Sequence, residues 1–238
     1  MSTGPGVLVR CLGSFRIEVG GTLRVLPPLR PLPRALLLLL ALHHGRDVHR
    51  EVLIDRLWPQ ASLEAAAHRL HAAASSVRRC LAEAGLGDDV VRRHGGAYSL
   101  CLDGAVVDVA EFESRLREAA RFGRVGDRHR TLAILLGALD LYQGELLDEV
   151  GPAEWVVPER ERLRVAAATA AFSAAQLTLL LRSPADALPL ARWATVLDPL
   201  RDTAWLLLAE TQERMGDAGS AAATRREHAL VSAQLTGP

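Results

Sequence analysis

The sequence predicts a mainly α protein with a small β part: an N-terminal winged helix with a β-sheet and a wing hairpin, then a C-terminal all-α, tetratricopeptide-like bundle. Three observations support this prediction. Short alternating apolar segments begin the chain, a long amphipathic helix with a basic side precedes a glycine-centred hairpin, and strand signals vanish from Val109 onward.

The first β-strands are predicted from alternation. Apolar residues occupy every second position at 7–11 and again at 15–19. Gly20-Gly21 then supplies a tight turn into a third strand over 22–25. Four prolines between positions 27 and 33 end this strand region, because proline has no backbone N–H to donate to a sheet.

Three helices are expected next, at about 34–43, 49–57 and 62–84. In the third, Ser62 is the expected N-cap, and Glu64 lies in the first turn, where the helix dipole favours an acidic residue. Apolar residues recur along it at helical spacing, which predicts a buried stripe. The stripe consists of Leu63, Ala66, Leu70, Ala74, Val77 and Leu81.

The opposite side of the third helix is small and basic. It contains Ala65, His68, Ala72, Ser75, Ser76 and Arg79, with Arg69 and Arg78 on its flanks. Small residues let a helix approach base edges closely in the major groove, and His or Arg side chains can donate to bases or phosphates. The same pattern also occurs on the solvated side of an ordinary core helix, so both readings stay open.

A basic hairpin follows. Strands are expected at Val90–Arg93 and Ala97–Leu102, joined by Gly95-Gly96. The predicted basic tip carries Arg92, Arg93 and His94. Such a tip can reach phosphates or a neighbouring minor groove. Arginines can occur on an exposed hairpin by chance, but strands, three helices and a basic hairpin in this order favour a winged helix.

The rest of the chain is predicted to be helical. Helices are expected at about 109–122, 127–142, 154–182, 185–197, 201–216 and 218–235. A break near Gly104 predicts domains at 1–104 and 105–238. Asp186-Ala187-Leu188 recurs as Ser220-Ala221-Ala222, 34 residues later, the period of a two-helix tetratricopeptide repeat. The concave side of such an array can hold a peptide or a small effector, and the sequence does not decide this.

Charge is distributed unevenly. Residues 1–104 carry 13 Arg against 9 acidic residues, and residues 105–238 carry 15 Arg against 19 acidic residues. A net charge of +4 in the N-terminal part and −4 in the C-terminal part suits a nucleic-acid-binding domain joined to a protein-contact domain.

Several classes of protein are not indicated. No window holds eighteen uncharged apolar residues and the N-terminus lacks signal-peptide features, so we expect no membrane span and a cytoplasmic location. The absence of Walker A, GxGxxG and HExxH motifs predicts no enzyme activity and no cofactor. Glu64, His68 and His71, or His43-His44, can ligate a metal in principle. Without a cysteine or carboxylate at standard spacing, we expect no metal site.

Three runs of sequence are distinctive in their order and spacing: HREVLIDRLWPQASLEAAAHRLHAAASSVRRCL, then VVRRHGGAYSLCL, then VVDVAEFE. Together they resemble the Streptomyces antibiotic regulatory protein family, which joins an OmpR-type winged helix to a bacterial transcriptional activator domain. The matching features are Leu57-Trp58-Pro59 between helices two and three, Arg78-Arg79, Gly96-Ala97-Tyr98, and Val107-Asp108 ahead of Phe112-Glu113.

The resemblance implies a transcription factor, usually an activator, that binds direct repeats in double-stranded DNA as a head-to-tail pair and contacts RNA polymerase. By position it implies contacts from His68, Arg69, Ala72, Ser76 and Arg78 of the helix and from Arg92, Arg93 and His94 of the wing. Relatives often have arginine where Ser76 stands and a larger or basic residue in place of Ala72. The resemblance as a whole predicts a sequence-specific activator of a biosynthetic gene cluster. Because of the departures at Ala72 and Ser76, the alternative is a protein-interaction scaffold with little DNA affinity.

Overall fold

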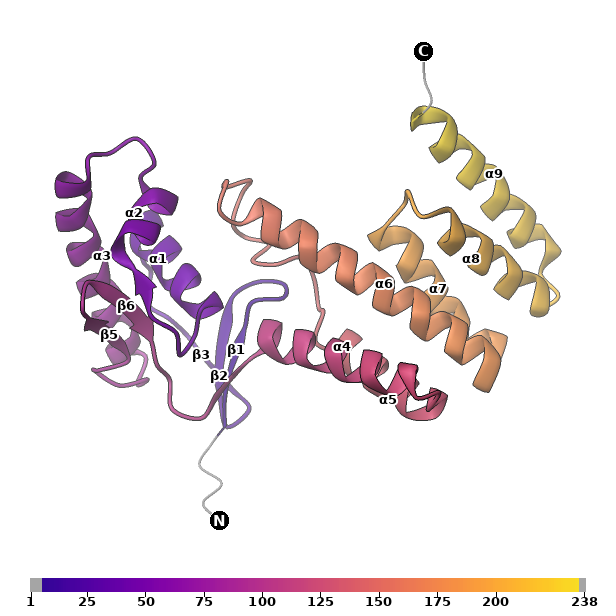
Figure 1. Ribbon diagram of the computed structural model, residues 1–238, viewed down its shortest axis with the longest axis horizontal. Coiled ribbons are helices and arrows are strands. Elements are labelled where there is room, and N and C mark those ends of the chain that lie inside the picture. The colour runs from indigo at the N-terminus through magenta and orange to yellow at the C-terminus, as the bar shows by residue number, and fades with distance from the viewer. Residues whose placement is uncertain (1–5, 236–238) are drawn as a thin grey trace. The chain divides into compact units, whose positions relative to one another are not determined.

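The computed structural model describes residues 6–235, apart from the side chains of Leu63 and Leu235. It confirms the mainly α class, with a small strand region near the N-terminus and a helical bundle towards the C-terminus (Figure 1). The chain divides into two compact units. The first is Met1–Glu111 with Leu146–Val157, and the second is Phe112–Glu145 with Pro158–Pro238.

The first unit contains every strand found in the described range. These are β1 (Val7–Arg10), β2 (Arg16–Val19), β3 (Thr22–Arg24), β4 (Val48–His49), β5 (Val91–His94), β6 (Ala97–Leu100) and β7 (Ala105–Val107). Its helices are α1 (Pro31–Leu42), α2 (Arg50–Leu57) and α3 (Leu63–Glu83). α1 begins at Pro31 and not near 34 as predicted, because a proline fits the first helical turn, where the N–H groups have no helical partner.

The N-terminal sheet has the order β3-β2-β1-β7, and β7 pairs with β1 in parallel. The other sheet has the order β4-β6-β5. Sequence alternation predicted neither β4 nor β7, because segments of two or three residues are too short to show it. β7 lies beyond the predicted boundary at Gly104. Compact units and domains need not coincide, so that boundary stays a prediction.

The buried stripe of α3 is confirmed for the side chains that the structure describes. Ala66, Leu70, Ala74, Val77 and Leu81 are at most 1% exposed. They face α1 and α2, which pack against α3. Burying one leucine contributes roughly 1.5–3 kcal/mol, so this stripe fixes which side of α3 faces outward.

A buried carboxylate joins β1 to the start of α4 (Asp108–Arg124). Asp108 is fully buried, and its oxygens accept the backbone N–H groups of Cys11 at 2.8 and 2.9 Å, Leu12 at 2.9 Å and Val109 at 2.8 Å. Burial raises the pKa of Asp108, although these hydrogen bonds oppose the rise. The loop after β1 therefore depends on a residue nearly a hundred positions later.

A segment from the second half of the chain completes the first unit. This strap, Leu146–Val157, follows the fifth helix and was predicted partly as helix. Leu147 is fully buried at a φ of 49°, and its N–H donates to the Cys11 carbonyl at 2.8 Å. Glu149 accepts the Phe15 N–H at 3.1 and 3.2 Å and the Arg34 guanidinium at 3.0 Å. The strap thus holds the β1–β2 loop and the start of α1 together.

Every regular element of the second unit is a helix within the described range. It contains most of α4 and the helices α5 (Arg128–Leu139), α6 (Val157–Leu181), α7 (Pro184–Leu197), α8 (Asp202–Arg214) and α9 (Ala218–Leu235). By length and composition α6 is apolar enough to cross a membrane, although the sequence contains no window of eighteen uncharged apolar residues. Half of that stretch is buried inside the structure.

The last three helices form the tetratricopeptide-like array that was predicted. α7 and α9 begin 34 residues apart, and α8 packs between them. Their first turns are capped in the same way. Ser183 accepts the Asp186 N–H at 3.2 Å, and Asp217 accepts the Ser220 N–H at 2.9 Å. The sequence period therefore reflects a repeated helix start.

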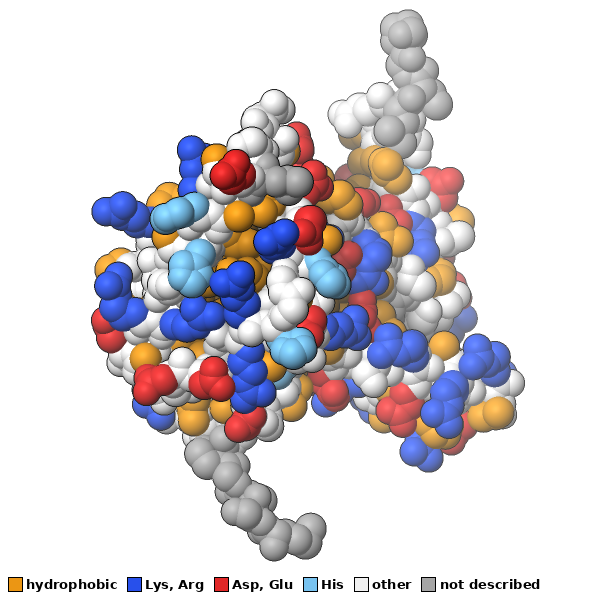
Figure 2. Space-filling model, turned by 60° about the vertical axis from the view of Figure 1, so that its left-hand side comes forward, with side chains coloured by type: hydrophobic (Ala, Val, Ile, Leu, Met, Phe, Trp, Pro, Cys, Tyr) orange, Lys and Arg blue, Asp and Glu red, His pale blue; other side chains and the backbone are white. Residues whose placement is uncertain are grey.

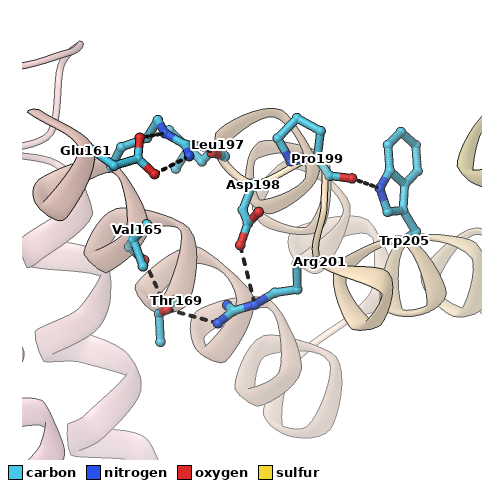
Figure 3. A network of polar contacts seen from close by, with 9 residues as sticks. Glu161, Val165, Thr169, Leu197, Asp198, Pro199, Arg201 and Trp205 are labelled. Carbon is cyan, nitrogen blue, oxygen red and sulfur yellow. Dashed lines mark hydrogen bonds and ion pairs between the residues drawn. The ribbon is translucent and has the colours of Figure 1, made fainter. Parts of the chain in front are cut away.

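Two arginines hold the turn between α7 and α8 against α6 (Figure 3). Arg164 donates to the Leu197 carbonyl at the end of α7. Arg201 donates to the Thr169 hydroxyl at 3.1 Å and lies 3.9 Å from the Asp198 carboxylate. The arrangement of α6, α7 and α8 is therefore fixed by polar contacts as well as by packing.

Candidate nucleic-acid interface

α3 presents the predicted side chains to solvent. Those of Ala65, His68, Arg69, Ala72, Ser75 and Arg79 are exposed, and those of Ser76 and Arg78 are half-buried. Ser62 occupies the N-cap position as expected, but its side chain makes no capping hydrogen bond there. The helix is 21 residues long, which gives it an outer side several turns in length.

The two serines of α3 already use their hydroxyl protons. Ser75 donates to the His71 carbonyl and Ser76 to the Ala72 carbonyl, both at 3.1 Å. Serine hydroxyls in helices commonly form this bond to the residue four positions earlier. Their oxygens keep free lone pairs, so towards DNA these serines would accept hydrogen bonds and not donate them.

The arginines of α3 differ in their surroundings. Arg78 donates through Nε to the Val91 carbonyl at 2.8 Å, which ties α3 to strand β5. Arg69 and Arg79 are exposed and form no ion pair with any residue between 6 and 235. Two of the three cations are therefore free to meet a phosphate, whereas the third also positions the hairpin.

The wing is a two-residue hairpin. Gly95 and Gly96 have φ values of 53° and 86°, the left-handed pair that a type I′ turn requires. Arg92 lies 3.5 Å from the carboxylate of Asp89, a pair in which both side chains are more than half exposed. Exposed ion pairs are worth about 0–1 kcal/mol, so a phosphate can displace Asp89.

The other basic residues at the tip are exposed as well. Arg93 lies over the ring of Tyr98, 5.9 Å from its centroid, and His94 ends strand β5 beside the turn. Tyr98 itself is buried in the central strand β6. The exposed basic side chains of β5 thus lie beside a buried strand, β6.

His44 anchors the far end of this hairpin. Its Nε2 accepts the Leu102 N–H at 2.9 Å, which requires a neutral ring. Burial lowers the pKa of His44, and the N–H that Nε2 accepts favours the same neutral ring.

This neutral histidine predicts an acid-sensitive wing. Because the folded pKa lies below the unfolded value of about 6.5, the stabilisation is fully present above pH 6.5 and is lost as the pH falls through the folded pKa. We expect His44→Gln, which cannot titrate, to show a smaller loss of unfolding free energy between pH 7.5 and pH 5. Urea unfolding at both pH values tests this, and equal losses in the two proteins would contradict it.

Figure 2 shows arginine and histidine side chains gathered over the first unit on the side turned to the viewer. We call the exposed basic surface of α3 and the hairpin the α3–wing face. It consists of His68, Arg69, Arg79, Arg92, Arg93 and His94. Cations distributed over two adjoining elements can bind several successive phosphates of a polyanion.

One feature beside this face was not indicated by the sequence. A hollow of about 420 Å³ lies at the start of α3, lined among others by Trp58, Ser62 and Arg69. The indole Nε1 of Trp58 is buried there without a hydrogen-bond partner among the described residues. The Leu57-Trp58-Pro59 motif in the sequence does not reveal that the indole N–H is an unused donor.

The candidate metal ligands are not brought together. Glu64, His68 and His71 lie on the solvent side of α3, and no group of three metal-binding side chains occurs within residues 6–235. The ring of His43 instead contacts the Leu39 carbonyl at 2.9 Å. The ring of His44 accepts the Leu102 N–H at the end of the hairpin.

Comparison with known proteins agrees with this architecture. Residues 107–233, more than half of the chain, match the family model "Bacterial transcriptional activator domain". The chain is 28% identical over 203 residues to the regulatory protein DnrI of Streptomyces peucetius, which covers 83% of this chain and 74% of DnrI. It is 29% identical over 133 residues to the regulatory protein AfsR of Streptomyces griseus, covering 56% of this chain.

A mycobacterial regulator is similar in sequence and in structure. The transcriptional regulatory protein EmbR of Mycobacterium tuberculosis is 26% identical over 148 residues, 62% of this chain. The solved structure of EmbR in complex with low affinity phosphopeptide superposes with a TM-score of 0.75 at 20% identity, covering 97% of this chain.

The relatives differ in how much of their length the chain spans. It spans 13% of AfsR, 38% of EmbR by sequence and 60% of the EmbR structure, but 74% of DnrI. The relatives are named as regulatory or transcriptional regulatory proteins. The chain belongs to the bacterial transcriptional activator domain family and, with these relatives, to the Streptomyces antibiotic regulatory protein family that its motifs resemble.

Proposed function

We propose that this chain is a sequence-specific DNA-binding transcriptional activator. α3 lies in the major groove, and the wing contacts the backbone or the adjacent minor groove. The observation that carries this proposal is the α3–wing face, where Arg69, Arg79 and Arg93 are exposed without an acidic partner in the described residues. The mechanism is physical: arginines displace counterions from phosphates, and α3 discriminates among bases.

The contact residues follow from this placement. We assign to the interface His68, Arg69, Ala72, Ser75, Ser76, Arg78, Arg79, Arg92, Arg93 and His94. In this assignment Arg78 contacts the DNA backbone and also holds β5 in place through its hydrogen bond to the Val91 carbonyl. Two copies bind direct repeats in the cytoplasm as a head-to-tail pair, and the complex contacts RNA polymerase at a biosynthetic gene cluster.

The salt dependence of binding tests the proposal. With about four to six phosphate contacts per protomer, the slope of log affinity against log salt concentration should be about −4 to −5. Fluorescence anisotropy with DNA from upstream of the chain's own gene, at several salt concentrations, measures this slope. A slope near zero would remove the electrostatic basis of the proposal.

Wing and helix variants should separate affinity from specificity. We expect Arg92→Ala with Arg93→Ala to weaken binding to all sequences about equally, by roughly tenfold, because phosphate contacts carry no sequence information. His68→Ala and Arg69→Ala should instead change the preference among sequences. Selection from a random DNA pool measures both effects, and full affinity in the wing double variant would exclude the wing from the interface.

A scaffold function is the second candidate. Ala72 offers no donor, and the hydroxyl proton of Ser76 is already bound to the Ala72 carbonyl, so the centre of α3 is poor in hydrogen-bond donors. In that case specific and nonspecific DNA would bind equally weakly, and the helical unit would carry the function. The salt titration with both DNAs decides between the two.

A further inference from the structure

A groove crosses the last three helices of the second unit, and the proposed DNA contact makes no use of it. It has a volume of about 530 Å³ and is lined by α7, α8 and α9. Ligand-binding clefts in proteins measure roughly 300–1,000 Å³. We call it the repeat groove; its two ends differ in chemistry.

One end of the repeat groove is apolar and held rigid. Trp205 is 7% exposed, and its Nε1 donates to the Pro199 carbonyl at 2.8 Å (Figure 3). Its ring stacks on His228 of α9, with centroids 5.8 Å apart and planes inclined by 13°. Val196 and Val231 line the same end, and Val196 is 72% exposed. An apolar side chain can be buried here without rearranging the site.

The other end is polar and contains a cation. Gln212 is 5% exposed, and its Oε1 accepts the Thr224 hydroxyl at 2.8 Å, so its Nε2 is the donor that remains. Arg192 lines this end and forms no ion pair in the part of the chain that the structure describes. The nearby Asp217 accepts the Ser220 N–H at 2.9 Å, and its pKa is lowered by its hydrogen bonds to Ser220 and by the charge of Arg192, which lies too far away for an ion pair. A carboxylate is therefore the group that this end can bind.

We infer that the repeat groove binds an extended peptide segment of a partner protein, with an acidic side chain at Arg192 and an apolar side chain beside Trp205. The groove is open to solvent and not an enclosed cavity, which suits an extended chain more than a small effector that must be enclosed. Glu227 on the same wall disfavours a polyanion such as nucleic acid. The unlike ends fix the direction of the peptide.

A peptide array tests this inference. Short peptides that combine one acidic, basic or neutral residue with one apolar or polar residue, at varied spacing, are probed with the full chain. Ala223→Arg fills the groove, and Ala229→Arg is the matched control, since Ala229 is exposed on α9 but does not line the groove. Arg192→Glu reverses the charge at an exposed position, so it tests recognition without threatening the fold.

The expected result is binding of peptides that pair an acid with an apolar residue. Ala223→Arg should weaken it by about tenfold or more, the effect of losing a central contact, whereas Ala229→Arg should not. Arg192→Glu should shift the preference from acidic to basic peptides. Three outcomes would overturn the inference: no peptide bound above background, equal losses in both alanine variants, or an acidic preference retained in Arg192→Glu. None of them bears on DNA binding.

Discussion

Replacing Asp108 with alanine is expected to lower the free energy of unfolding of the first unit by about 2–4 kcal/mol. The change leaves the N–H groups of Cys11, Leu12 and Val109 without their carboxylate partner in a fully buried place. Each unsatisfied buried donor costs about 1–3 kcal/mol. The effect is smaller than three such costs, because burying the carboxylate was itself unfavourable, as its raised pKa indicates.

Urea unfolding followed by circular dichroism measures this loss. Asp103→Ala is the matched control, because Asp103 is exposed and lies in the same stretch of chain. We expect it to change the unfolding free energy by less than about 0.5 kcal/mol. Similar values for the two variants would mean that the buried carboxylate does not hold the β1 loop.

Ala72→Glu is expected to weaken DNA binding by about a hundredfold or more. Ala72 lies midway along the exposed side of α3, where a glutamate would meet phosphates and base edges at close range. Like charges placed together in an interface cost several kcal/mol, and each 1.4 kcal/mol is about tenfold in affinity. This prediction depends on the proposed function.

Two further variants make this result specific. Ala229→Glu adds the same charge to an exposed position of α9 and should leave DNA affinity within about twofold of the unmodified chain. Ala72→Arg adds a cation at the centre of the α3–wing face and should strengthen binding. Unchanged affinity in Ala72→Glu, measured by anisotropy at constant salt, would mean that α3 does not face the DNA.

The sequence predicted α3 well because both of its sides carry a strong period. Leu70, Val77 and Leu81 proved buried, and Arg69 and Arg79 proved exposed. The array was also predictable, since a repeated helix start leaves matching residues at a fixed interval. In each case the signal lies within a single local pattern.

What the sequence could not predict is what distant segments do together. The strap shows no period of its own, and its partners lie far away: Ser14 bonds to Asp148 across 134 residues. Likewise, Arg78 looks like any other helix arginine until its bond to the Val91 carbonyl is seen. A short strand such as β7 is stabilised by its parallel partner and not by its own composition.

The strap also sets an order of events during synthesis. A ribosome releases the N-terminal strands and α3 long before it reaches Leu146 and Glu149, yet these late residues complete the loop after β1. The winged helix therefore leaves the exit tunnel with an unfinished edge and closes only after the strap, Leu146–Val157, has been translated. Messenger truncated before that point would encode an N-terminal fragment that lacks its own closing segment.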